Sequence, residues 1–76
     1  MKIFFFESVN DGVHLPYKMM SVVLAAEDDN DAQVVLKSHL RDTTGSEGLA
    51  QFFSLVETSV TDQALESGEL ITRVQR

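Results

Sequence analysis

The chain contains no cysteine, no tryptophan and only one proline among its 76 residues. Without thiols it can form neither a disulfide nor a thiolate metal site, and a cysteine nucleophile is excluded. Small secreted domains usually depend on disulfides, so we expect a cytoplasmic protein. One proline and four glycines are also too few for a linker or a low-complexity segment. We therefore interpret residues 1–76 as a single globular domain.

Long hydrophobic runs and basic residues are scarce as well. The apolar run at residues 3–6 stops at Glu7, which is too short for a secretory signal or a membrane span. Six basic residues stand against twelve acidic ones, giving a net charge of −6. This balance disfavours direct binding to nucleic-acid backbones and to anionic membranes. It leaves two explanations, solubility or a negative surface presented to a basic protein partner.

The hydrophobic patterns predict four strands and one long helix, in the order β-β-α-β-(short α)-β. Alternating or continuous apolar residues indicate strands at residues 2–9, 17–26, 51–58 and 69–75. A helix is expected from Asp28 or Asp29 to Arg41, because one stripe of residues recurs at helical spacing: Ala32, Val35, Leu36, His39 and Leu40. A short helical turn is expected within residues 61–67, ended by Gly68.

These elements predict an α+β fold, a mainly antiparallel sheet with the long helix across one face. Residues 17–58 would form a strand-helix-strand crossover, either direct or split by another strand. The first three strands carry large apolar residues on both faces, whereas one helix covers only one face. We therefore expect the second face to bury itself against another copy, a partner or a folded-back terminus.

The doubled residues Met19-Met20 and Phe52-Phe53 indicate which positions lie on this second face. Neighbours in a strand point to opposite sides, so one of each pair belongs to the core and the other faces whatever covers the second side. We assign the apolar partner-binding face to four residues: Phe4, Phe6, Met20 and Phe52.

A second candidate surface is the acidic run before the helix. Glu27, Asp28, Asp29 and Asp31 are typical of a helix cap that also complements the helix dipole. The same residues could instead contact lysines and arginines of a partner. A calcium loop is excluded, because no register offers both a glycine at the sixth position and a glutamate at the twelfth. We predict no metal and no cofactor.

Catalytic patterns are missing from the sequence. His14 and His39 are isolated, and two histidines do not make a zinc site. His39 lies on the apolar stripe, which favours a partly buried histidine with a satisfied hydrogen bond. No serine lies in a nucleophile elbow, and no glycine-rich phosphate loop is present. An enzyme would need a pocket that joins His14 to Glu7 or Asp11. We predict a protein that is not an enzyme.

Residues 22–36, VVLAAEDDNDAQVVL, run from a strand through an acidic cap into a helix. In this pattern, in size and in acidity, the chain resembles small proteins of phages and mobile elements, including some type I anti-CRISPR inhibitors. The resemblance implies an inhibitor that occupies a basic channel or a subunit surface of a nucleoprotein machine, and it assigns no functional residue.

The predicted function is thus a small acidic protein-binding module that sterically occludes a basic partner surface. Its acidic patch would steer the encounter and its apolar sheet face would supply affinity. The alternative is a homodimeric structural or assembly subunit that uses the second sheet face.

Overall fold

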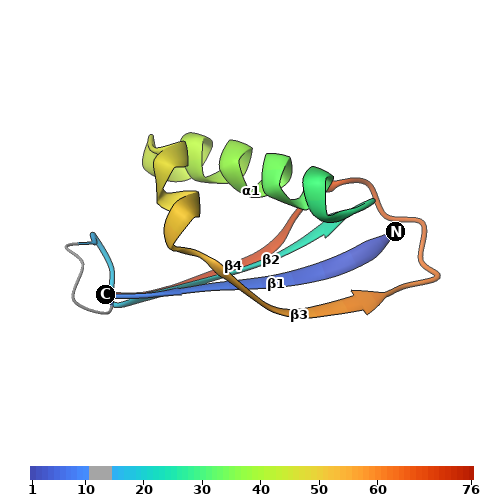
Figure 1. Cartoon of the computed structure of the whole chain (residues 1–76), viewed down its shortest axis with the longest axis horizontal. Helices are drawn as coiled ribbons and strands as arrows, with labels where there is room; N and C mark the ends of the chain where they lie inside the picture. The colour runs from blue at the N-terminus through green and yellow to red at the C-terminus, as the bar shows by residue number, and fades with distance from the viewer. Residues whose placement is uncertain (11–14) are drawn as a thin grey trace.

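A computed structural model of the chain describes residues 1–10 and 15–76 and shows two layers, a sheet and a helix lying on it (Figure 1). The elements in chain order are β1 (Lys2–Val9), β2 (Met19–Ala26), α1 (Asp29–Thr44), the 3-10 helix η1 (Glu47–Phe52), β3 (Ser54–Val60) and β4 (Gly68–Gln75). The predicted α+β class is confirmed, and so is the order of the four strands and the long helix. None of the helices described here has the length and apolar composition needed to cross a bilayer.

The sheet has the strand order β3-β1-β2-β4, and every neighbouring pair is antiparallel. Because β1 lies between β2 and β3, the crossover through α1 is the split version. Each edge strand contains a β-bulge: the register shift leaves Val56 without a partner in β3 and Leu70 without one in β4. Bulges increase the local twist, which makes both edges poor templates for open-ended strand pairing.

Helix α1 begins with a side-chain cap and ends with a backbone cap, in which the Gly45 N–H donates to the Arg41 carbonyl. The Asp28 carboxylate accepts a hydrogen bond from the Asp31 N–H at 2.8 Å. Gly45 ends the helix in the left-handed region, with φ of 80°, a conformation that glycine adopts without strain. The predicted end at Arg41 was three residues too early. Thr43 and Thr44 continue the helix beyond this point and donate their hydroxyls to carbonyls one turn earlier.

The short helix lies before β3 instead of after it. Residues 61–67 are not helical: the Thr61 N–H donates to the Met1 carbonyl, and the Gln63 N–H turns back to the Thr61 hydroxyl. The predicted third strand began three residues too early, since Phe52 ends η1 and β3 starts at Ser54. Residues 45–48 form the C-terminal cap of α1 and the first turn of η1.

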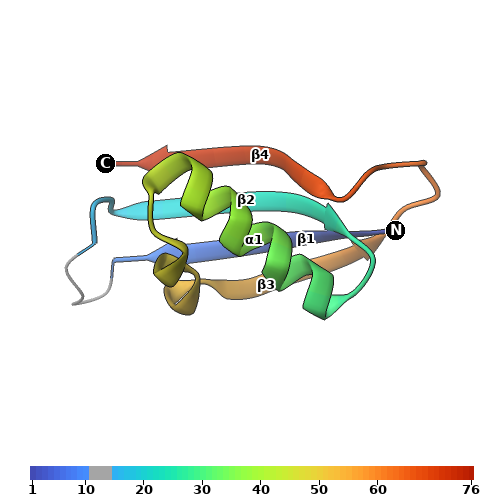
Figure 2. The ribbon, with the colours of Figure 1, turned by 90° about the horizontal axis from the view of Figure 1, so that it is seen from above.

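The core lies between α1 and one face of the sheet. In Figure 2, α1 crosses the strands diagonally, with its first turn on the β3 side and its last turn towards β4. Alternate residues of β1 and β2 meet the buried helix residues and are themselves buried: Phe4, Phe6, Ser8, Met20, Val22, Leu24 and Ala26 against Ala32, Leu36 and Leu40. The one buried polar side chain among them is satisfied, because the Ser8 and Tyr17 hydroxyls lie 2.7 Å apart.

This packing corrects the predicted binding face. Phe4, Phe6 and Met20 are at most 5% exposed and lie under α1, so they belong to the core. Phe52 is half-buried in η1 and packs against the same core. The strands do carry a second apolar face, as predicted. It is formed by the residues that alternate with Phe4, Phe6 and Met20 along the strands, because α1 covers the face that was assigned to the partner.

Candidate protein-binding surface

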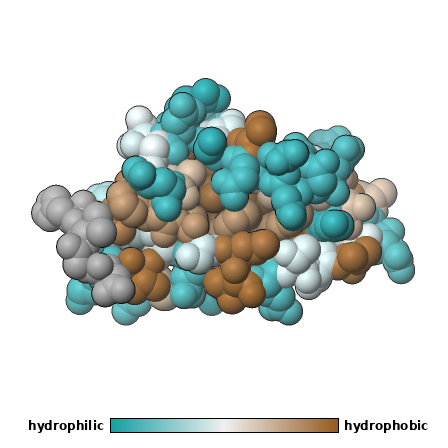
Figure 3. All heavy atoms as spheres, in the orientation of Figure 1, coloured by the Kyte–Doolittle hydropathy of each residue, from teal (hydrophilic) through white to brown (hydrophobic). Residues whose placement is uncertain are grey.

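The sheet face away from α1 is not covered by any element of the described chain (Figure 1). Strand alternation places seven apolar residues on it, of which Ala25 is fully buried by its neighbours: Ile3, Phe5, Val9, Met19, Val23, Ala25 and Ile71. We call this side the open face. The side chains of Phe5, Val23 and their inner neighbours are half-buried by one another, whereas Ile71 remains 52% exposed. In Figure 3, which views the sheet from its edge, hydrophobic groups alternate with hydrophilic ones along the sheet layer, while the helix layer is mostly hydrophilic.

The open face is hollowed at its centre. Phe5, Met19, Val23 and Ile71 line the hollow together with Glu7, Ser21 and Arg73, and its volume is about 460 Å³. The cross-strand register puts Phe5 between Glu57 and Val23, and puts Glu7 in the same row as Ser21 and Arg73. The apolar centre is thus bordered by two carboxylates on the β3–β1 side and by one guanidinium on the β4 side.

These border charges have no opposite charge beside them in the described chain. The one ion pair within residues 1–10 and 15–76 joins Arg41 to Glu47 at 3.8 Å, on the helix side. Arg73 is exposed and stands two strands away from Glu7 in the same row. Its guanidinium therefore remains available to a carboxylate supplied from outside.

The acidic end of α1, which is Glu27, Asp28, Asp29 and Asp31, is partly explained by capping. Asp28 accepts from the Asp31 N–H, and Asp31 Oδ2 accepts from the Glu27 N–H at 3.0 Å and from the Ser67 hydroxyl at 2.8 Å. These bonds form a reciprocal cap and tie the helix start to the segment before β4. The side chains of Glu27 and Asp29 have no such role among the described contacts and are exposed.

The hydrogen bond from the Glu27 N–H, followed by that from Ser67, holds the pKa of Asp31 below its ordinary value. A carboxyl whose pKa is lower in the folded state stabilises the fold above its unfolded pKa. This contribution is present at neutral pH and is lost as the pH falls through the folded pKa. Asp31 therefore acts in the structure as an ionised cap.

His39 is a structural residue, as predicted. Its Nε2 lies 2.8 Å from the Thr72 Oγ1, and the Thr72 hydroxyl donates to Glu69 Oε1 at 3.2 Å. Since that hydroxyl gives its proton to Glu69, it accepts from the imidazole, and Nε2 carries the hydrogen. The chain of bonds ties α1 to β4.

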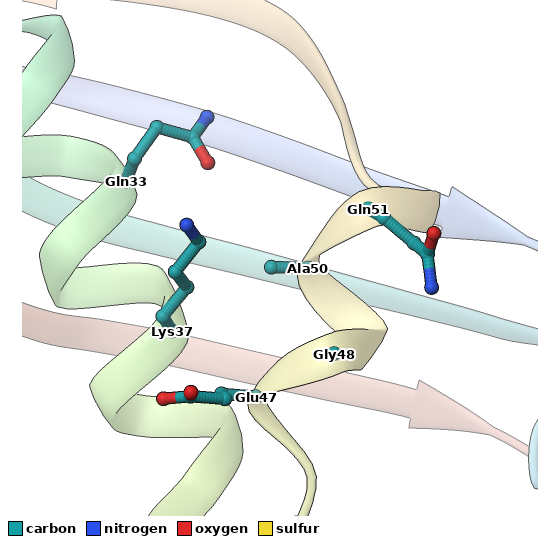
Figure 4. A pocket seen from close by; sticks show the side chains of 6 residues that line it. All are labelled: Gln33, Lys37, Glu47, Gly48, Ala50 and Gln51. Carbon is teal, nitrogen blue, oxygen red and sulfur yellow. The ribbon is translucent and has the colours of Figure 1, made fainter.

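A polar hollow lies between α1 and η1 (Figure 4). Gln33 and Lys37 extend from α1 towards η1, the Glu47 carboxylate lies beside the helix, and Gln51 points away from it. Small residues of η1, Gly48 and Ala50, form the rest of the lining. The hollow contains one positive and one negative group and no buried polar side chain, so it offers no selective ligand chemistry.

No group of three or more metal-ligating side chains occurs within residues 1–10 and 15–76. The enzyme hypothesis required His14 together with Glu7 or Asp11, and both His14 and Asp11 lie outside the described residues. Glu7 is described and lies on the open face, beside Ser21.

Comparison of the chain with protein-family models, with curated proteins and with solved structures finds no match. The inference about function therefore depends on the surfaces described above.

Proposed function

We propose that the chain is a protein-binding module without enzymatic activity and that the open face is its principal binding surface. The observation that carries the proposal is a central apolar area on a sheet face with no second layer. Exposed apolar patches bordered by polar groups are typical of protein interfaces in small domains. Burial of such a surface contributes about 25 cal/mol per Å² before the costs of association.

Replacing Phe5 with lysine is the direct test. Phe5 lies in the middle of the open face, and a lysine there stands next to Glu57, so the sheet tolerates the new charge. Loss of a central aromatic anchor, with a charge buried in its place, is expected to weaken partner binding about 30-fold or more. Binding is measured by comparing the proteins that the immobilised variant and parent capture from a lysate.

The matched control is Val34→Lys, which introduces the same charge at a 64% exposed apolar residue on α1. Proteins captured by the parent and by this control, but not by Phe5→Lys, support the proposal. A captured set that is the same for all three baits would show that the open face is not the binding surface.

A second candidate function uses the acidic end of α1 and follows the inhibitor hypothesis, in which a basic partner surface is sterically occluded. It is favoured by Glu27 and Asp29, which are exposed beside the first turn of α1 and make no capping bond through their side chains. The helix macrodipole places partial positive charge at this end of α1. The negative potential there therefore comes mostly from these carboxylates. The two surfaces lie on different layers and are mutually compatible.

The double variant Glu27→Gln plus Asp29→Asn tests this candidate and leaves the Asp28 and Asp31 caps in place. Association with a basic partner is expected to slow about tenfold at low ionic strength, and the difference should shrink as salt screens the charges. Captured proteins should elute from this bait at lower salt than from an Asp42→Asn plus Glu66→Gln bait, which loses two exposed carboxylates elsewhere. Equal elution would remove the acidic end from the binding surface.

A further inference from the structure

We propose that a second copy of this chain occupies the open face, packed face to face about a two-fold axis that runs parallel to the strands. The inference rests on the proposed function, since it names the occupant of the same surface. It commits to one of the two symmetric arrangements that keep the strands of the stacked sheets aligned. In the first the axis lies along the strands, and in the second it lies across them.

An axis along the strands places β1 of one copy over β2 of the other. Each residue of β1 then faces the residue that is its own cross-strand partner in the register. Phe5 meets Val23 and Glu7 meets Ser21, so a larger side chain meets a smaller one in both of these rows. Facing positions that alternate in size interdigitate without voids.

The perpendicular axis gives a worse interface. The perpendicular axis places β1 of one copy over β1 of the other copy, with the two strands running in opposite directions. Glu7 then faces Phe5 or Ile3 of the second copy. A carboxylate would then be desolvated against apolar groups without a partner, at a cost of several kcal/mol by the usual penalty for a buried charge. The position of Glu7 therefore selects the axis along the strands.

The border charges are complementary only in the same arrangement. The axis along the strands places β4 of one copy over β3 of the other. Arg73 then lies opposite Ser54, with Glu57 one row away on the facing strand and Glu7 one strand away in the same row, while Glu57 at the edge of the sheet lies opposite Ile71. The perpendicular axis places Arg73 of one copy over β4 of the other, beside Ile71 and away from both carboxylates. Two-fold symmetry forms each contact twice, which doubles its effect on affinity.

The area of the face is sufficient for a dimer that dissociates on dilution. Four strands of about eight residues cover about 20 by 26 Å, so two facing sheets bury about 1,000 Å² in total. This value is close to the lower limit for specific interfaces, which is about 1,000 Å². We therefore expect a reversible dimer whose mass depends on protein concentration.

The test is the solution mass of two charge variants, measured separately and as a mixture by light scattering on a sizing column. One variant is Arg73→Glu, and the other is Glu7→Lys combined with Glu57→Lys. When either variant is measured alone, side chains of like charge face each other between the two copies. The affinity of dimerisation should therefore weaken about tenfold or more. In the heterodimer both contacts are again opposite in sign, so mixing should restore affinity to within about threefold of the parent.

The control Lys37→Glu changes the net charge by the same amount as Arg73→Glu but lies on α1. It should dimerise like the parent. A parent that is monomeric at every concentration overturns the second copy as occupant, while the Phe5→Lys comparison still decides the proposed function by itself. A mixture that binds no more tightly than its components, or a Lys37→Glu variant that is as weak as Arg73→Glu, overturns the two-fold arrangement.

Discussion

Replacing Phe4 with alanine is expected to lower the free energy of unfolding by about 3–5 kcal/mol, the range for truncation of a buried phenylalanine. Phe4 is fully buried on the central strand β1, between Leu24 and Thr58, and its ring stacks on Phe6 with centroids 6.3 Å apart. A domain of this size has a total stability of about 4–11 kcal/mol, so the variant should lie near or below the folding threshold. Urea denaturation followed by circular dichroism measures the change.

Phe5→Ala is the matched control, because it makes the same chemical change one residue later on the open face. Phe5 is only half-buried, so its truncation should cost about 1 kcal/mol of monomer stability, provided that the measurement is made at a dilution where any dimer has dissociated. Equal losses for the two variants would contradict the assignment of the covered and open faces.

The assignment of these faces is where reasoning from the sequence went wrong, and the signal that decides it was present. Glu7 and Ser21 fall on the same alternation as Phe5 and Val23, near the middle of the two central strands. On the other alternation of β1 and β2, the polar residues are Lys2 at one end and Ser8 near the other. A carboxylate cannot lie under a helix without a partner, so the face with Glu7 is the one left open. The small hydroxyl of Ser8 can be buried, because Tyr17 satisfies it.

The strands and the long helix were predictable because each depends on a local pattern. β1 follows from its continuous apolar run and α1 from its stripe of Ala32, Leu36 and Leu40. The ends of elements depended on contacts that no local pattern reveals. Thr44 lies within the helix, where its hydroxyl donates to the Leu40 carbonyl, whereas the Thr61 N–H donates to the distant Met1 carbonyl in a segment that is not helical. Strand order is non-local in the same way, and the bulges at Val56 and Leu70 have no signature in the sequence.

The candidate site was predictable as a kind of surface but not as a set of residues. An excess of apolar strand residues over what one helix can cover predicted an uncovered face. The complementary charges at its border became apparent only with the register, since Arg73 and Glu57 are distant in sequence and lie on opposite edge strands. The role of Asp31 as an ionised cap likewise depends on Ser67, a contact across 36 positions.

Leu36→Ala is expected to destabilise the fold by about 2–5 kcal/mol, because Leu36 is fully buried in the middle of the only long helix in the described chain. Alanine has the higher helix propensity, so the loss would come from the cavity left above the sheet and not from the helix itself. Val34→Ala provides the comparison, since Val34 is 64% exposed on the outer side of α1, and there alanine should change stability by less than about 0.5 kcal/mol, in the favourable direction. Thermal melts of the two variants at matched dilute concentration separate these contributions. If both melted at the temperature of the parent, α1 would not pack on the sheet in this register, and the open face could no longer be distinguished from the covered one.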